Sequence, residues 1–257
     1  MTTKRRRVGI VIKTAEELAL MREAGRIVAL TLAALRAAVR PGVSTAELNA
    51  LAEEVAHKHG AVPSFKGYRG YPASLCASIN EEVVHGIPSP RRVLHEGDIV
   101  SLDFGAIYRG LQGDGAITVP VGQVSEVAQR LLAVTEQALA LGVAQTRPDN
   151  RLSDVGHAIQ AYVEGQGFSV VRVYVGHGIG RAMHEEPNVP NFGPPSRGPL
   201  LKPGMVLALE PMVNVGTFNT VVLDDKWTVV TGDGSLSAHF EHTVAVTPNG
   251  PAVLTLP

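Results

Sequence analysis

Apolar positions near the start of the chain recur at the spacing of an α-helix. Thr14 and Glu17 have the spacing of a capping box, and Pro41 followed by Gly42 is a stop signal. Between these signals, the apolar positions fall three or four residues apart: Met21, Ala24, Val28, Leu32, Leu35 and Val39. The pattern predicts one amphipathic helix that buries a single face.

The same arrangement returns later in the chain. The segment that starts at Arg40-Pro-Gly aligns with the one that starts at Arg147-Pro-Asp, 107 positions further on. Both predict a helix, and the first has a capping box at Ser44 and Glu47 and ends at Gly60. A further helix is expected at about 125–144, in the position that corresponds to the first helix.

The offset of 107 also relates two apolar, strand-like runs, Gly97–Asp103 and Gly204–Glu210, each of which ends on a carboxylate. We therefore expect two similar halves, about 14–120 and 121–257, each a pair of helices followed by antiparallel strands. They would form one domain over 14–257, preceded by an unstructured tail at 1–13. Related halves would bring the two acids together at their seam, although duplication alone also produces similar cores.

Composition narrows the functional classes. The 257 residues carry a formal net charge of −1, which gives no overall field to attract DNA or an acidic membrane. No apolar run is long enough to span a bilayer, and Val8–Ile12 is too short for a signal peptide. Cys76 is the one cysteine, so an internal disulfide is excluded, as expected in a reducing cytoplasm. The basic run Lys4–Arg7 fits a solvated tail or a transient contact with the ribosome.

Two acids interrupt apolar strand patterns. Asp103 lies within Ile99-Val-Ser-Leu-Asp-Phe, where a carboxylate is costly to bury, and Asp114 follows 11 residues later. A hairpin that turns at Tyr108-Arg109 would place the two acids opposite each other. Like charges that face across a sheet are destabilising unless a cation lies between them. A solvated sheet rim is the alternative interpretation.

Three further groups extend this set. Glu210 and Glu241 lie in apolar strand patterns, and His177 is flanked by glycines, which let the backbone approach whatever the ring binds. Alone, His177 also fits a structural turn. Four carboxylates and one imidazole favour Mn, Co, Fe or Zn in a two-ion site over a thiolate-lined structural zinc site. Two divalent ions would neutralise about four negative charges and could activate a water molecule.

Motifs spread over most of the chain resemble those of bacterial type I methionine aminopeptidases. The similarity runs from about Thr14 to the end, and the motifs occur in the family's order and spacing: His85-Gly-Ile-Pro, Gly97-Asp-Ile-Val, Gly176-His-Gly-Ile-Gly-Arg, His184-Glu-Glu-Pro, Gly204-Met, Glu210-Pro-Met and Glu241-His-Thr. The resemblance implies the α+β pita-bread fold, in which two pseudo-two-fold-related halves form an antiparallel sheet covered by helices. It also implies a metal-dependent hydrolase whose single catalytic domain spans 14–257.

The resemblance assigns a role to each motif residue. The metal ligands implied are Asp103, Asp114, His177, Glu210 and Glu241. Glu210 would also carry the proton while a metal-bound hydroxide attacks the substrate carbonyl. His184 would stabilise the tetrahedral intermediate, and His85 would contact the amide of the residue after methionine. The activity implied is removal of the initiator methionine from nascent polypeptides that have a small second residue.

The methionine pocket implied by the resemblance is apolar and polarizable, which suits an unbranched thioether. Its lining residues would be Tyr68, Tyr71, Cys76, Met183 and Trp227. Each also fits an ordinary core position. Phe65, Met183 and His239 depart from the family's usual residues. The sequence therefore does not determine the exact shape of the pocket, and His239 could add a metal contact.

Three alternatives remain at this stage. Prolidases share the fold and the five ligands but carry a further N-terminal domain, for which only about 13 residues are present before the first helix. Type II methionine aminopeptidases carry a helical insertion, whereas 187–203 is proline-rich. A non-catalytic relative that binds peptides or RNA would have lost ligands. We expect a monomeric cytoplasmic enzyme whose partners are the N-termini of nascent chains.

Overall fold

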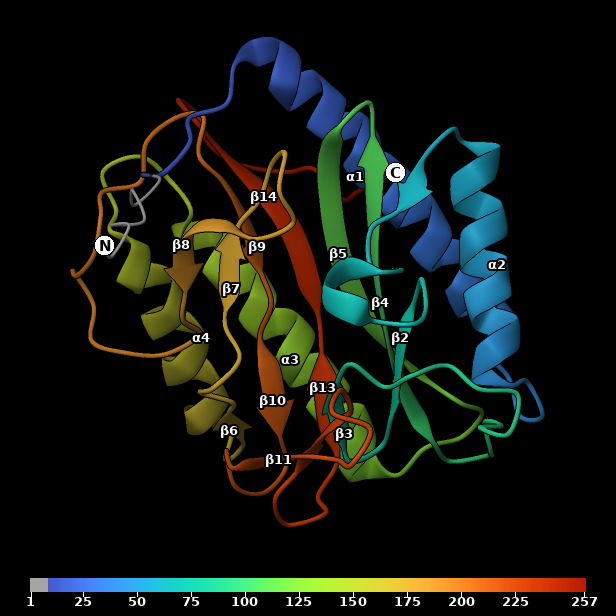
Figure 1. Cartoon of the computed structure of the whole chain (residues 1–257). Coiled ribbons are helices and arrows are strands. Elements are labelled where there is room, and N and C mark those ends of the chain that lie inside the picture. The colour runs from blue at the N-terminus through green and yellow to red at the C-terminus, as the bar shows by residue number, and fades with distance from the viewer. Residues whose placement is uncertain (1–8) are drawn as a thin grey trace, which may run out of the picture.

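Residues 9–257 fold into four long helices that pack along one side of an antiparallel sheet (Figure 1). The computed structural model describes residues 9–257. Within that range the helices are α1 (Ala15–Ala38), α2 (Thr45–Lys58), α3 (Glu126–Gln145) and α4 (Leu152–Gly165), with a short 3₁₀ helix, η1 (Tyr68–Gly70). Over these residues, no helix has the length and apolar character needed to cross a membrane.

The strands form one large and two small sheets, and every pairing is antiparallel. The large sheet runs in the order β1 (Val62–Pro63), β4 (Ile99–Tyr108), β5 (Leu111–Pro120), β14 (Glu241–Thr247), β9 (Val206–Leu209), β7 (Gly176–Gly178) and β8 (Glu185–Val189). Two further strands join it, β2 (Cys76–Ile79) beside β4 and β15 (Gly250–Val253) beside β14. The small sheets are β13 (Ser237–His239), β10 (Met212–Asn214) and β6 (Ser169–Val170), and β11 (Thr220–Val222), β12 (Val229–Thr231) and β3 (Glu82–Val84).

The predicted helix signals are confirmed. Thr14 and Ser44 each cap a helix in a full capping box, with Glu17 and Glu47 as the reciprocal partners. Both ends of α4 lie 107 positions after the ends of α2, as the sequence offset requires. The α+β fold class, an antiparallel sheet covered by helices, is therefore the observed one.

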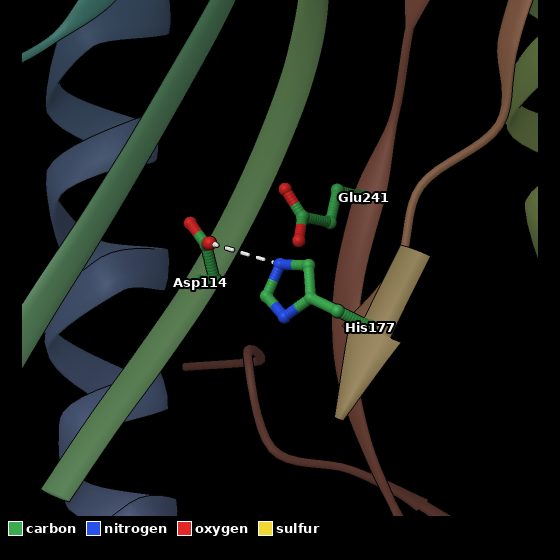
Figure 2. Close-up of side chains that lie close together, drawn as sticks. All are labelled: Asp114, His177 and Glu241. Atoms are coloured by element: carbon green, nitrogen blue, oxygen red, sulfur yellow. Dashed lines mark ion pairs between the residues drawn. The ribbon is translucent and has the colours of Figure 1, made fainter. Parts of the chain in front are cut away.

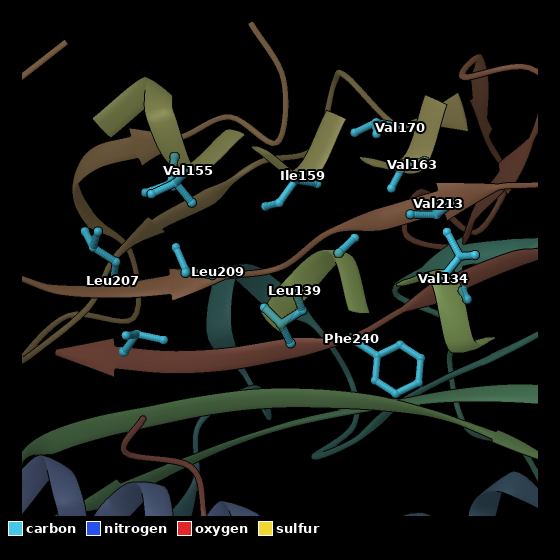
Figure 3. Packing of buried hydrophobic residues seen from close by; sticks show 14 of the residues in the cluster. Val134, Leu139, Val155, Ile159, Val163, Val170, Leu207, Leu209, Val213 and Phe240 are labelled. Carbon is cyan, nitrogen blue, oxygen red and sulfur yellow. The ribbon is translucent and has the colours of Figure 1, made fainter. Parts of the chain in front are cut away.

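Alternation along the central strands separates an apolar face from a polar face. On β4, Leu102 and Phe104 are fully buried in the cluster beneath α1 and α2, so Asp103 points away from the helices. On β9, Leu207 and Leu209 pack against α3 and α4 with residues such as Val155, Ile159 and Phe240 (Figure 3). Each such side chain contributes about 1.5–3 kcal/mol by burial, which anchors the sheet on its helices. The opposite face is left for polar groups.

The hairpin between β4 and β5 differs from the predicted register. Gly105 pairs with Asp114, and Asp103 pairs with Ala116. The prediction of directly opposite aspartates is wrong because the turn is a two-residue loop at Arg109 and Gly110, with φ of 49° and 82°. Two-residue loops of this kind need positive φ at both positions. Since the shift is two residues, both aspartates still face the same side of the sheet.

The tail expected at residues 1–13 lies only partly within the described residues. Its basic run, Lys4–Arg7, lies outside the described residues. At the other end, Lys13 is only 6% exposed and forms an ion pair with Glu185, so the fixed part of the chain begins ahead of α1.

Close approach of α1 to its neighbours requires glycine at position 25. A Cβ there would lie 2.3 Å from the carbonyl oxygen of Leu254, and a Cβ on Gly113 would lie 2.7 Å from the backbone nitrogen of Gly25. We expect Gly25→Ala to lower the free energy of unfolding by about 1–3 kcal/mol, because backbone must move to admit the methyl group. Urea denaturation at fixed metal concentration measures this.

Gly165→Ala is the matched control. Gly165 is also helical, but no atom of a packed neighbour lies within 4 Å of the place that an added Cβ would take. We expect its stability to stay constant or rise by up to about 1 kcal/mol. Equal losses in both variants would contradict the packing argument.

Candidate active site

Strand register places three acids on the polar face of the sheet. Ala116 on β5 is the direct partner of Asp103 on β4 and of Glu241 on β14. Residues directly opposite each other share a face, and so do residues two apart on one strand. Asp114 precedes Ala116 by two residues, so it joins Asp103 and Glu241. The three acids therefore meet where β5 pairs with β14.

Register adds the remaining predicted groups from the other side of the seam. His177 on β7 is opposite Ala208 on β9, and Ala208 is opposite Thr243 on β14. Glu210 follows Ala208 by two residues and Thr243 follows Glu241 by two. All five predicted ligand positions thus face the same side. Thr243 fixes the seam by exchanging hydrogen bonds with the backbone of Asp114, each 2.8–2.9 Å long.

Three of these side chains, Asp114, His177 and Glu241, lie close together (Figure 2). His177 Nε2 lies 3.9 Å from Asp114 Oδ2 and 3.6 Å from Glu210 Oε1. One ligand-type atom from each of Asp114, His177 and Glu241 lies within 4.8 Å of the other two. His177 Nδ1 donates to the carbonyl oxygen of Gly178 at 2.9 Å, which leaves the Nε2 lone pair directed at the acids.

These carboxylates are buried beside one another, and among residues 9–257 no positively charged side chain stabilises their ionised forms. Burial raises the pKa of Asp103, Glu210 and Glu241 well above the usual range, and it raises the pKa of Asp114 to about 7. Over residues 9–257, Asp103 Oδ1 and Glu241 Oε1 are buried without a hydrogen-bond partner. Burial also lowers the pKa of His177 to about 4, so its ring is a neutral donor of an electron pair. An oxygen-rich, partly orphaned set with one imidazole fits divalent metal ions.

His184 lies beside this cluster on the loop between β7 and β8. Its ring centroid is 4.2 Å from that of His177, and its Nδ1 is 2.8 Å from the hydroxyl oxygen of Tyr68, whose ring stacks on it. Desolvation lowers the pKa of His184 to about 4. The imidazole is therefore neutral at pH 7 and held by an aromatic neighbour.

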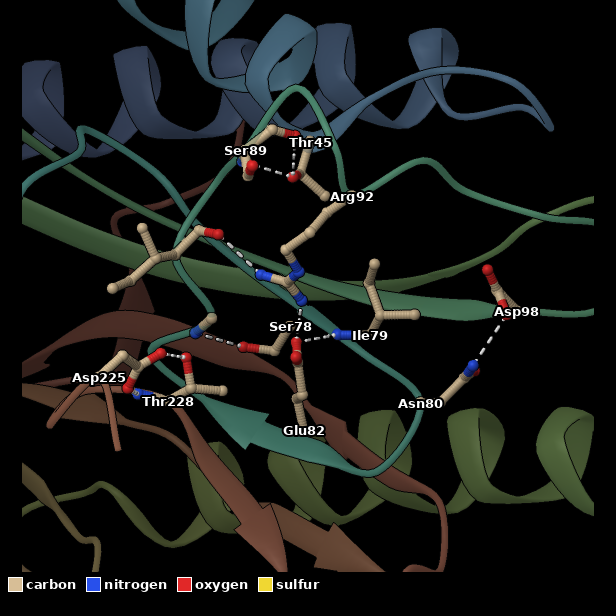
Figure 4. Close-up of polar contacts among 12 residues, drawn as sticks. Thr45, Ser78, Ile79, Asn80, Glu82, Ser89, Arg92, Asp98, Asp225 and Thr228 are labelled. Atoms are coloured by element: carbon tan, nitrogen blue, oxygen red, sulfur yellow. Dashed lines mark hydrogen bonds and ion pairs between the residues drawn. The ribbon is translucent and has the colours of Figure 1, made fainter. Parts of the chain in front are cut away.

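His85 directly follows β3 and begins a loop that is held by hydrogen bonds. Figure 4 shows polar contacts of Ser78, Glu82 and Arg92 that hold this loop. The φ of His85 is 62°, a left-handed conformation that surrounding bonds must hold. The next peptide is fixed by Gly86 N–H donating to Ser78 Oγ at 3.1 Å. Arg92 donates to the carbonyl oxygen of Ile87 at 2.7 Å and pairs with Glu82. Burial lowers the pKa of His85 to about 4, so it too is neutral.

One cavity of about 150 Å³ collects all of the predicted site residues. Its lining contains Tyr68, Tyr71, Cys76, His85, Asp103, Asp114, His177, Met183, His184, Glu210, Trp227 and Glu241. The lining combines the acids with aromatic groups, and Tyr71 meets Trp227 edge to face with ring centroids 5.1 Å apart. The same cavity therefore brings ligand-type polar groups together with apolar and aromatic ones.

Phe65 and Arg69 complete the lining. The Phe65 ring and the Met183 methyl group close over Gly105, where an added Cβ would lie 3.0 and 2.8 Å from them. Arg69 was missed by the sequence reasoning, although Gly67 and Gly70 mark its segment as an exposed turn. Its guanidinium lies 5.3 Å from the centroid of the Tyr68 ring.

His239 lies outside this lining. It is 2% exposed, and among the described residues its Nε2 has no hydrogen-bond partner. Its backbone N–H and carbonyl both bond to the hydroxyl of Thr118, at 2.9 and 2.8 Å. A metal contact by the His239 ring stays a prediction.

A curved antiparallel sheet with helices on one face and an acid-rich cavity on the other defines a metallohydrolase of the pita-bread fold. The profile of metallopeptidase family M24 matches residues 19–248. The chain therefore belongs to this family and, within it, to the bacterial methionine aminopeptidases, as the following relatives establish.

The methionine aminopeptidase of Clostridium acetobutylicum is 58% identical over 247 residues, which covers 96% of this chain and 99% of the relative. Methionine aminopeptidase 1 of Bacillus subtilis is 56% identical over 246 residues, with 96% and 99% covered. The crystal structure of the Thermotoga maritima methionine aminopeptidase matches with a TM-score of 0.95 and 48% identity, covering 96% of this chain and all of that one. The predicted family and fold are confirmed, and membership implies use of divalent metal.

Bound metal should offset the loss of stability that occurs when the buried carboxyl groups ionise. A carboxyl whose folded pKa is raised contributes stability below its unfolded pKa of about 4 and loses it as pH rises through the folded value. For Asp114 that value is about 7. We expect metal-free protein to melt at a lower temperature at pH 8 than at pH 6, and Mn²⁺ to raise the melting temperature more at pH 8.

Thermal scans with and without Mn²⁺ at both pH values measure this effect. Asp114→Asn should lose most of the Mn²⁺-dependent gain, whereas the exposed helical acid Glu136, changed to Gln, should retain it. A gain that is equal at the two pH values, or unchanged in Asp114→Asn, would argue against metal at these carboxylates.

Proposed function

We propose that this protein removes the N-terminal methionine from new polypeptides and prefers a small second residue. The observation that carries the proposal is one cavity whose lining joins the five ligand-type side chains to apolar and aromatic side chains. The names of its relatives support the same activity. The preference for a small second residue rests on the resemblance alone.

Two divalent ions, drawn from Co, Mn, Fe or Zn, would be held by Asp103, Asp114, His177, Glu210 and Glu241. Two ions match about four carboxylate charges, and within residues 9–257 Asp103 and Glu241 each have a buried oxygen without a hydrogen-bond partner that could bind metal. When bound, the ions would act as Lewis acids and lower the pKa of a water molecule. The protein provides the fixed strand positions that hold them.

Glu210 would move the proton of the reaction. It follows strand β9 at the edge of the cluster, and burial raises its pKa, which favours the protonated form after it has accepted a proton. Glu210 Oε1 lies 3.6 Å from His177 Nε2, so the carboxyl group is beside another proposed ligand. The same carboxyl could then donate the proton to the leaving amine.

The two neutral histidines would bind the scissile region of the peptide. If the Tyr68 hydroxyl donates to His184 Nδ1, the ring carries its proton on Nε2 and can donate it to the substrate carbonyl oxygen. That bond would strengthen as negative charge develops on the oxygen. His85, on the facing loop, would contact the amide after methionine.

The apolar end of the cavity would bind the methionine side chain. Tyr71, Cys76 and Trp227 form one wall with Phe65, and Met183 packs with Phe65 and Tyr68 on the other. Polarizable walls suit a thioether. Burial raises the pKa of the Cys76 thiol, so the thiol stays protonated as a small apolar group rather than serving as a nucleophile.

The proposal places the enzyme in the cytoplasm as a monomer, with residues 14–257 as one catalytic domain. The single-domain assignment is supported by residues from both halves of the chain, such as Asp103 and Glu241, lining one cavity. N-termini of nascent chains would be its partners, and a ribosome contact would use Lys4–Arg7.

The function is tested by hydrolysis of Met-Ala-Ser and Ala-Pro-Ser peptides by metal-depleted protein, with and without Mn²⁺ or Co²⁺. We expect metal-dependent release of methionine from the first peptide only, and slower release from Met-Leu-Ser. Cleavage of Ala-Pro-Ser would favour a proline-specific peptidase. No cleavage by protein with bound metal would reject an enzymatic function.

His184→Ala tests the proposed donor to the carbonyl oxygen. We expect kcat to fall by about 10²–10³-fold with a much smaller change in KM, because the bond is made mainly in the transition state. His57→Ala, on the exposed face of α2, should leave both constants unchanged. A rise in KM at constant kcat would assign His184 to ground-state binding.

A further inference from the structure

A buried ion pair links the segment before α1 to the loop that carries His184. Lys13 Nζ lies 2.7 Å from Glu185 Oε2, and the two side chains are only 3% and 13% exposed. The ammonium group also donates to the carbonyl oxygen of Val11 at 3.3 Å. The backbone N–H of Lys13 donates to the carbonyl oxygen of Gly204 at 2.8 Å, so the lysine is itself anchored to the second half of the chain.

Glu185 connects Lys13 to the backbone of the loop that carries His184. Its second oxygen, Oε1, accepts from the backbone N–H of Ala182 at 3.2 Å, which spans the two residues that carry the site side chains, Met183 and His184. A Cβ on Gly180 would lie 2.4 Å from Lys13 Cε and 2.7 Å from Glu185 Oε1. The ion pair therefore fills the space directly against the loop backbone.

We propose that Lys13 is a positioning residue for His184, acting through Glu185. The inference rests on the proposed role of His184. Lys13 is absent from the cavity lining, so it does not act on substrate directly. Its charge fixes the Glu185 carboxylate, the carboxylate fixes Ala182, and the loop between them sets the position of the His184 ring.

The burial of the pair makes this positioning sensitive to its loss. Removing one partner leaves the other charge buried without compensation, and the freed carboxylate must turn toward water. That movement would pull the loop away from its present path. A displacement of about 1 Å in a catalytic group can cost about 10²-fold in rate.

The same loop offers a matched control. Arg181 pairs with Glu17 at 3.0 Å and so also joins the loop to the start of α1, but the arginine side chain is 70% exposed. If any tether between these segments sufficed, loss of this pair would have the same effect as loss of the buried one. An exposed pair of this kind contributes little.

The experiment compares steady-state constants of metal-loaded Lys13→Met, Glu185→Gln, Lys13→Arg and Arg181→Met on Met-Ala-Ser. We expect kcat to fall at least tenfold in the first two with KM within about twofold, partial recovery in Lys13→Arg, and no change in Arg181→Met. The double variant Lys13→Met/Glu185→Gln should lose less than the product of the single losses. A kcat within twofold of the parent in Lys13→Met, or an equal fall in Arg181→Met, would overturn the proposal.

A second comparison separates positioning from general destabilisation. In a His184→Ala background, Lys13→Met should cause no further loss, because the ring it positions is gone. An equal additional loss there would assign Lys13 to overall structure. If His184→Ala alone is fully active, the proposed role of His184 fails instead. Should Lys13→Met not fold, Glu185→Gln and Lys13→Arg carry the same comparison.

Discussion

Burial of several carboxylates beside one another is the constraint on which the rest of the structure depends. Each acid loses hydration, and each repels its neighbours, so the group costs free energy until a cation compensates it. The fold offsets that cost through the two apolar clusters between the helices and the sheet. Among residues 9–257, the acids can therefore remain without a compensating charge, and Asp103 and Glu241 each keep a buried oxygen without a hydrogen-bond partner. A site of this kind is prepared by the protein and completed by metal.

The pairing of β5 with β14 determines where the ligand-type side chains lie. The first half of the chain supplies Asp103 and Asp114, and the second supplies His177, Glu210 and Glu241. Four of these residues lie on strands and Glu210 directly follows β9, so strand register puts all five on one face. Strands restrict side-chain direction more tightly than loops do, which suits ligands whose separation must match metal coordination.

The sequence predicted the parts of the fold that depend on local signals. Capping boxes at Thr14 and Ser44 located helices, and acids in apolar runs located the site. The hairpin register escaped prediction because the positive φ at Arg109 depends on the turn that forms. Lys13 escaped because its partner, Glu185, is 172 positions away, and no local pattern specifies such a pairing. The pocket walls came from family resemblance, since each residue alone also fits an ordinary core.

The structure divides the work of the site between strands and loops, and each kind of element is fixed differently. The metal-type ligands lie on or directly after strands, where the backbone ladder holds them. His85 and His184 lie on loops, which lack a ladder, and beside each loop is one largely buried ion pair, Arg92–Glu82 or Lys13–Glu185. Apolar contacts could hold these loops with equal strength, but they are non-directional. A desolvated ion pair has one favourable geometry, so it specifies where the loop lies even where it adds little net stability.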